Sequence, residues 1–276
     1  MFRSIAFLLI ICSTQLHAWN SMGHRLVAQI AIDELPVGYV KKLSHLNHVL
    51  DAIYPPRKLV NSATWMDDIR FDDIQWYTTY HYEDKYFSED GTPLPKQCGQ
   101  YARWAISTAV QSLENPRTTA LNKAMALRVI LHVIGDIHQP LHSIAKVSKA
   151  YPQGDAGGNY YSLTKNTVGR SLHEFWDNGA GYLISNKPVK YQDILKTARH
   201  IEKKYPCRSL PVGQVDVSHW LDESRKIGIE KVYAPLKGSS KIPAQYQSAA
   251  QKISQYQIAL AGCRLAKLLK QTHVAY

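Results

Sequence analysis

Residues 131–142 read LHVIGDIHQPLH, and this segment sets both the fold and the chemistry expected of the chain. Its first part continues an apolar segment with helical spacing, so His132 and Asp136 lie one above the other on one helix face. Pro140 ends that helix and lets His142 turn back toward the same face. An imidazole and a carboxylate at this spacing are more often an ordinary polar pair, but they can also share a metal ion.

Outward from this segment, helical periodicity dominates the chain. Apolar residues recur every three or four positions, which predicts helices at 26–35, 101–113, 120–137, 191–203, 219–233 and 246–269. The exception is 159–164, where Tyr160, Tyr161 and Leu163 favour a strand and residues 165–166 favour a hairpin turn. Internal repeats and long linkers are absent from the sequence. We therefore expect a mainly α fold, a single compact helical domain with a small β-hairpin.

Three further segments carry metal-binding side chains beside aromatic residues. His173 and Asp177, in SLHEFWD at 171–177, repeat the one-turn spacing among large apolar residues, where an unpaired carboxylate would be costly. Asp67 lies in TWMDDIR at 64–70, and His81 lies in YHYED at 80–84. Each residue taken alone is more often structural. Their number, added to the pair at His132, favours a metal centre.

The first residues of the sequence are typical of an export signal. An apolar run at 5–12 follows Arg3, and small residues near Ala18 predict cleavage there, which gives a signal peptide at 1–18 and a mature domain at 19–276. Later segments fall short of the ~20 consecutive apolar residues of a transmembrane helix. We expect a periplasmic or secreted protein without a membrane anchor.

Cleavage after Ala18 would make Trp19 the first residue of the mature chain. An N-terminal amine and its own carbonyl can chelate zinc in a five-membered ring, and His24 follows in WNSMGH at 19–24. In the alternative reading, Trp19 is a core residue and Gly23 is only a flexible joint.

The mature chain is basic. The 276 residues include 33 Lys and Arg against 22 Asp and Glu, and loss of Arg3 with the signal leaves 32 against 22, a net charge of +10. Such an excess favours anionic partners, although it also suits the solubility of a protein that binds none.

Cysteine use also fits export. Cys12 leaves with the signal, and Cys98, Cys207 and Cys263 remain in a compartment where one disulfide is expected. We expect Cys98 to pair with Cys207, and Cys263 to be a buried thiol in an apolar helix.

Taken together, these residues resemble a known family. From Trp-x-x-x-x-His at 19–24 to AGCRLA at 261–266, and most specifically in GDIHQPLH at 135–142, the chain is similar to the zinc-dependent single-strand nucleases of fungi and the bifunctional nucleases of plants. Their superfamily includes bacterial zinc phospholipases C. The resemblance implies a phospholipase C/nuclease-like fold and three Zn²⁺ ions. It implies one ion held by Asp67, His81, His132 and Asp136, a second by His142, His173 and Asp177, and a third by Trp19, His24 and the bridging Asp136.

The same resemblance implies which residues meet the substrate. Arg70 and Asn159 match catalytic positions near the bound phosphate, and Tyr82 and Asp84, with Asn159, match positions that bind the substrate. A guanidinium can fork onto phosphate oxygens, and a ring can stack on a base. Three positions depart from the family pattern without removing a ligand: Met66, Tyr80 and Ser171.

The implied activity is hydrolysis of single-stranded DNA and RNA by a metal-activated hydroxide, with 5'-phosphate products, and release of phosphate from 3'-nucleotides. The partners are therefore single-stranded nucleic acid and 3'-nucleotides, and we expect a monomer. Two alternatives share the ligand set: a zinc phospholipase C and an exported zinc-binding protein without turnover. Tyr82 and Asp84 favour nucleic acid over lipid. Arg70 and Asn159 favour an enzyme, because neither is needed to hold metal.

Overall fold

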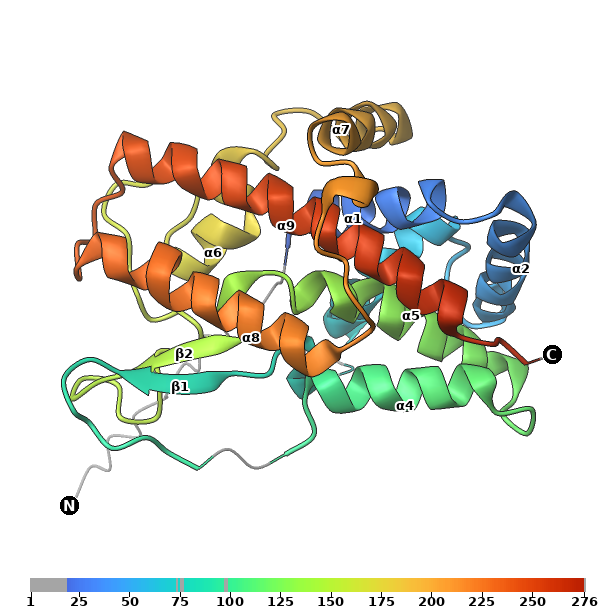
Figure 1. Cartoon of the computed structure of the whole chain (residues 1–276), viewed down its shortest axis with the longest axis horizontal. Coiled ribbons are helices and arrows are strands. Elements are labelled where there is room, and N and C mark those ends of the chain that lie inside the picture. Colours follow the sequence, from blue (N-terminus) through green and yellow to red (C-terminus); the bar gives the residue numbers. More distant parts are fainter. Residues whose placement is uncertain (1–18, 73, 75–76, 97–98, 276) are drawn as a thin grey trace, which may run out of the picture.

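The computed structural model describes residues 19–72, 74, 77–96 and 99–275, and most of them are helical (Figure 1). The predicted signal peptide at 1–18 lies outside the described residues. The helices are α1 (Ser21–Asp33), α2 (Val37–His48), α3 (Trp65–Asp68), α4 (Ala102–Glu114), α5 (Ala120–Asp136), α6 (Leu172–Asp177), α7 (Tyr191–Lys204), α8 (Val217–Ile227) and α9 (Ala244–Gln271), and short 3-10 turns connect several of them.

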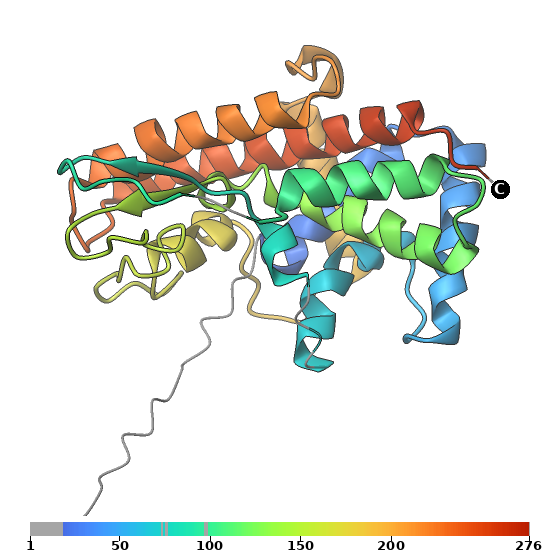
Figure 2. The same ribbon diagram turned by 90° about the horizontal axis from the view of Figure 1, so that it is seen from below.

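Helix α5 forms the centre of the molecule. The Thr119 side chain caps its first turn by accepting from the Asn122 amide at 3.3 Å. Most of its apolar residues are buried, and Leu127, Ile130 and Val133 are fully so. Figures 1 and 2 show α4 running beside α5. The α5 segment LHVIGD therefore lies where solvent is excluded.

Helices α1 and α9 pack closely on the other side of α5. Gly262 permits this approach, because a Cβ at its position would lie 2.7 Å from the Ile30 side chain. Helix α7 covers the outer side of α1 (Figure 1). No described helix combines the length and the apolar composition that crossing a membrane demands.

The small sheet differs in place and type from the predicted hairpin. Strands β1 (Lys85–Ser88) and β2 (Ile144–Val147) pair in parallel, with Lys85 opposite Ile144. The predicted strand at 159–164 contributes an isolated antiparallel bridge from Ser162 to Ser171. A parallel pair joins segments far apart in the chain, and local alternation does not reveal such a pair.

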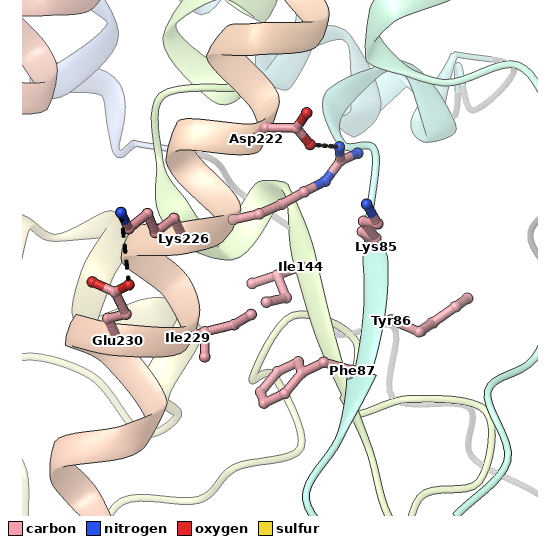
Figure 3. Close-up of a pocket in the computed structure, with 9 residues that line it drawn as sticks. Lys85, Tyr86, Phe87, Ile144, Asp222, Lys226, Ile229 and Glu230 are labelled. Atoms are coloured by element: carbon pink, nitrogen blue, oxygen red, sulfur yellow. Dashed lines mark hydrogen bonds and ion pairs between the residues drawn. The ribbon is translucent and has the colours of Figure 1, made fainter.

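Helix α8 and the π-helical turn after it, Gly228–Tyr233, cover one face of the sheet. Figure 3 shows Phe87 and Ile144 pointing toward Ile229, while Tyr86 points away from them. A cavity of about 330 Å³ lies between these elements and holds none of the predicted site residues. The side chain of Tyr86 also borders a second cavity, which lies beside the candidate metal ligands.

The predicted partner of Cys207, Cys98, was wrong. Cys207, in the turn Cys207–Ser209, bonds to Cys263 of α9, with their Cα atoms 5.5 Å apart. Cys263 is buried, as predicted, but as half of a disulfide. Cys98 lies outside the described residues. The pairing follows the packing of α9 against the turn, which spacing along the sequence does not encode.

Candidate metal centre

The end of α5 brings two predicted ligands into one buried site. Asp136 and His132 are both fully buried, and the carboxylate atom Oδ2 lies 3.3 Å from His132 Nε2. The same atom lies 3.2 Å from His81 Nδ1, and Oδ1 lies 3.3 Å from His24 Nε2. Residues from three separate segments therefore meet at one carboxylate.

Asp67 and His81 complete this group. Asp67 follows Trp65 and Met66 in α3, and His81 ends the turn Thr78–His81. Asp67 Oδ1 lies 3.8 Å from His81 Nδ1 and 3.7 Å from His132 Nε2. These separations leave room for one ion between the side chains.

Histidine tautomers show where the lone pairs point. Nδ1 of His132 donates to the Ala63 carbonyl at 2.6 Å, so its Nε2 carries the lone pair. That lone pair faces His81 Nδ1 at 3.0 Å. A carbonyl on the far ring nitrogen is the usual outer partner of a metal-bound histidine.

A second group repeats this arrangement. His142 Nδ1 donates to the His81 carbonyl at 2.7 Å, and His173 Nδ1 donates to the Gly157 carbonyl at 2.7 Å. When both rings are neutral, both Nε2 atoms carry lone pairs, yet they face each other at 3.0 Å. Two acceptors cannot share a hydrogen bond, whereas a common cation between them satisfies both. With zinc–nitrogen bonds of ~2.0 Å, two tetrahedral ligands lie about 3.3 Å apart.

Asp177 is the carboxylate of the second group. Its Oδ2 lies 3.5 Å from His173 Nε2, and its Oδ1 lies 3.9 Å from His142 Nε2. Gln139 donates to Oδ1 at 2.6 Å and so fixes the orientation of the carboxylate. Gln139 was not among the predicted site residues, although it lies inside the segment 131–142.

The segment from Trp19 to His24 reaches the first group. Trp19 is fully buried, and Asn20 beside it caps α1 and donates its backbone N–H to the Asp177 carbonyl at 2.9 Å. Gly135 permits this approach, because a Cβ there would lie 3.0 Å from His24 Nδ1. The His24 ring stacks on His132 with centroids 3.9 Å apart. His24 therefore lies beside Asp136, and the Trp19 ring lies near Gly135, the residue before it.

Burial makes the site unfavourable for charge unless a cation balances it. Burial raises the pKa of Asp136 and of Asp177 well above the ordinary value. Burial also lowers the pKa of His132, and of His81 to well below its ordinary value. Within the described part of the chain, neither oxygen of Asp136 accepts a hydrogen bond. Imidazole nitrogens and carboxylate oxygens are the donor types that zinc accepts.

The predicted phosphate-binding residues lie near these groups. Arg70 Nη1 lies 3.8 Å from Asp67 Oδ1, so the guanidinium reaches the edge of the first group. Asn159 follows Gly158, whose carbonyl accepts from the His173 backbone amide at 3.3 Å. Its own side chain donates to the Ala156 carbonyl at 2.8 Å.

Tyr82 and Asp84 line a cavity of about 250 Å³ together with His142 and His173. Burial, with the nearby charge of Asp155, raises the pKa of Asp84 to about 7. The Tyr82 ring lies 5.7 Å from that of Tyr101. Three further tyrosines border this cavity and were missed because they come from separate segments: Tyr86, Tyr101 and Tyr160.

Comparisons with known proteins agree with this geometry. The S1/P1 nuclease family model matches residues 19–273. Nuclease S1 of Aspergillus oryzae is 30% identical over 208 residues, which cover 68% of this chain and 66% of that protein. Nuclease P1 of Penicillium citrinum is 24% identical, with 92% and 98% covered, and Endonuclease 1 of Arabidopsis thaliana is 25% identical, with 96% and 90% covered. The family match spans both histidine and aspartate groups, and the chain belongs to the S1/P1 nuclease family.

Proposed function

We propose that this nuclease cleaves single-stranded DNA and RNA to 5'-phosphate products, and releases phosphate from 3'-nucleotides, at a centre of three zinc ions. The observation that carries the proposal is the pair of Nε2 lone pairs of His142 and His173, which face each other at 3.0 Å inside a family of phosphodiester hydrolases. Facing lone pairs have no role in a purely structural hydrogen-bond network.

We assign the residues to three ions by the pattern of the family. Asp67, His81 and His132 would hold the first with Asp136, and His142, His173 and Asp177 would hold the second. The N-terminal amine and carbonyl of Trp19 would hold the third with His24 and Asp136. Bound zinc supplies Lewis acidity for the phosphate and lowers the pKa of water toward ~7.

The protein's own groups would bind and orient the substrate. Arg70 can donate two parallel hydrogen bonds to phosphate oxygens, and Asn159 can donate one from beside His173. Tyr82 would stack on a base whose polar edge meets Asp84. A duplex would first have to unpair, at a cost of a few kcal/mol, so single strands are preferred.

Export is part of this proposal, because the third site needs a free amine at Trp19. Cleavage after Ala18 would create that amine outside the cytoplasm, in a compartment that also allows the Cys207–Cys263 disulfide. We expect the mature protein to be a monomer, which light scattering on a sizing column would measure.

The test compares the protein that begins at Trp19 with a form carrying one extra Met before Trp19. We expect near three zinc ions per chain and single-strand cleavage in the first, and loss of one ion and most turnover in the second. A form with the extra Met after Tyr276 controls for the added residue. Hydrolysis of phosphatidylcholine in preference to single-stranded DNA would assign a lipid substrate instead. No hydrolysis by the correctly processed, zinc-loaded protein would refute the proposed activity.

A further inference from the structure

A cavity of about 490 Å³ lies between α4 and the first half of α5, next to the metal centre. It is larger than the cavities at Ile229 and at Tyr82. Ligand pockets in proteins commonly measure ~300–1,000 Å³. Figures 1 and 2 show the two helices side by side along this groove. Aromatic side chains line the groove near the metal ligands: Trp65, Tyr77, Tyr80 and Trp104. Polar side chains, among them Arg117 and Asn122, line its outer part.

Of the four aromatic residues, Trp65 and Tyr77 are buried, whereas Trp104 and Tyr80 present ring surface to solvent. The Trp104 side chain is 40% exposed, and its ring lies 5.2 Å from that of Tyr80 at an angle of 46°. Tyr80 is half-buried. An exposed indole beside a hollow is a surface that stacking by a flat ligand would cover.

The groove adjoins the metal centre through residues next to candidate ligands in the sequence, although no candidate ligand lines the groove itself. Tyr80, His81 and Tyr82 are consecutive, and His81 is a candidate ligand. Tyr80 lines the α4–α5 groove, whereas Tyr82 lines the cavity beside His142. Met66 likewise lines the groove directly before the candidate ligand Asp67. One aromatic cavity therefore borders His142 and His173, and the other contains the residues that directly precede Asp67 and His81.

A positive charge lies at the outer end of the groove. Arg117 is exposed in the loop between α4 and α5 and forms no ion pair with any residue that the structure describes. Asn122 and Ser112 offer hydrogen-bonding groups nearby. The stacking faces and polar groups fit one more base of a single strand on Trp104, and Arg117 adds a positive charge for the anionic backbone of a longer strand.

We propose that the α4–α5 groove binds a second base of the strand. The two bases would flank the scissile phosphate, one at Tyr82 and the other in the groove. The proposal rests on the proposed function, because both bases belong to the strand that crosses the metal centre. A 3'-nucleotide has no second base and would leave the groove empty. A dinucleotide would occupy both cavities.

The experiment compares a dinucleotide with the 3'-nucleotide that carries the same first base, each with Trp104→Ala and Trp104→Phe. Stacking on an aromatic side chain changes affinity by roughly tenfold per base. We expect Trp104→Ala to lower kcat/KM for the dinucleotide about tenfold and to leave the 3'-nucleotide unchanged. Trp104→Phe should retain most of the activity. Ile229→Ala, at an equally exposed apolar residue in the cavity of Figure 3, is the control and should change neither.

Binding of a non-hydrolysable phosphorothioate dinucleotide to the same zinc-loaded variants gives a second readout that needs no turnover. We expect Trp104→Ala to weaken this binding about tenfold. An equal loss on both substrates, no loss on either, or equal effects of Ala and Phe would overturn the second base site while leaving single-strand cleavage intact. If the wild-type protein cleaves no single strand, the proposed function fails, and the binding measurement still decides whether the groove holds a base.

Discussion

Replacing Gly157 with alanine tests how the second histidine group is held. Gly157 has a φ of +61°, and a Cβ there would lie 2.4 Å from the Leu141 carbonyl oxygen and 3.2 Å from His173 Nδ1. The Leu141 carbonyl belongs to the short turn Pro140–His142, which leaves it little room to move. Gly213 has the same φ of +61° in an exposed loop, where the nearest atom would lie 3.9 Å from the Cβ.

The two substitutions share the cost of the left-handed backbone and differ in the clash. An alanine in that conformation costs ~1–2 kcal/mol, and the reduced freedom of the unfolded chain returns ~0.4–1 kcal/mol. Gly213→Ala should therefore lower the free energy of unfolding by about 1 kcal/mol. At Gly157, overpacking adds ~1–3 kcal/mol. Displacing the Gly157 carbonyl, which accepts from His173 Nδ1, adds ~1 kcal/mol. The difference between the variants should be about 3 kcal/mol.

Urea unfolding of both variants, with zinc and after chelation, measures this difference. Zinc analysis and single-strand cleavage on the same samples report whether His173 still binds metal. We expect Gly157→Ala to lose zinc and activity and Gly213→Ala to keep both. Equal unfolding free energies within about 0.5 kcal/mol, with full zinc in both variants, would show that the Gly157 contact neither limits packing nor positions His173.

Three further predictions concern the disulfide, the base cavity and the second metal group. The double change Cys207→Ala, Cys263→Ala should lower the free energy of unfolding by about 4 kcal/mol, since the bond closes a loop with a separation of 56 residues. Cys98→Ser should leave unfolding unchanged, and destabilisation by it in urea titrations would support the Cys98–Cys207 pairing instead. Burial raises the pKa of Asp84 to about 7, above its unfolded value of ~3.9, so its ionisation destabilises the fold progressively from about pH 4 to pH 7. Asp84→Asn should remove that part of the pH dependence, and unfolding curves at pH 5 and pH 8 that match the wild type would contradict it. Gln139→Ala should weaken zinc binding by roughly 10- to 100-fold, because its amide orients a ligand carboxylate, and competition with a chelator measures the change.

Local patterns in the sequence predicted most of the helices, because an amphipathic helix carries its own periodic signal. The prediction at 120–137 matches α5 within one residue, and 191–203 matches α7 within one residue. Helix α2 was missed, since only Leu43, Leu46 and Asn47 of its residues are buried and its apolar face is short. The parallel sheet and the disulfide were misplaced for a different reason. Both join segments far apart in the chain, and tertiary packing alone brings these together.

The candidate ligands could be predicted because the family pattern assigns each residue type to a position, and the structure brings these positions together. The supporting contacts could not be predicted. Positions 135 and 157 require glycine because His24 and the Leu141 carbonyl come close to them, and tertiary packing sets such distances. The tyrosines around Tyr82 likewise converge from separate elements.

The C-terminal helix influences the metal centre although it contributes none of the candidate ligands. His138 lies in the turn between Asp136 and His142, and burial together with the Arg264 charge lowers its pKa to about 3. Its neutral ring donates from Nδ1 to the Ile134 carbonyl at 2.8 Å and accepts from Arg264 Nη1 at 3.1 Å. The Gln257 side chain donates to the His138 carbonyl at 3.0 Å. Helix α9 thereby fixes the turn that positions His142 within the second group, and the Cys263 disulfide anchors α9 one residue before Arg264.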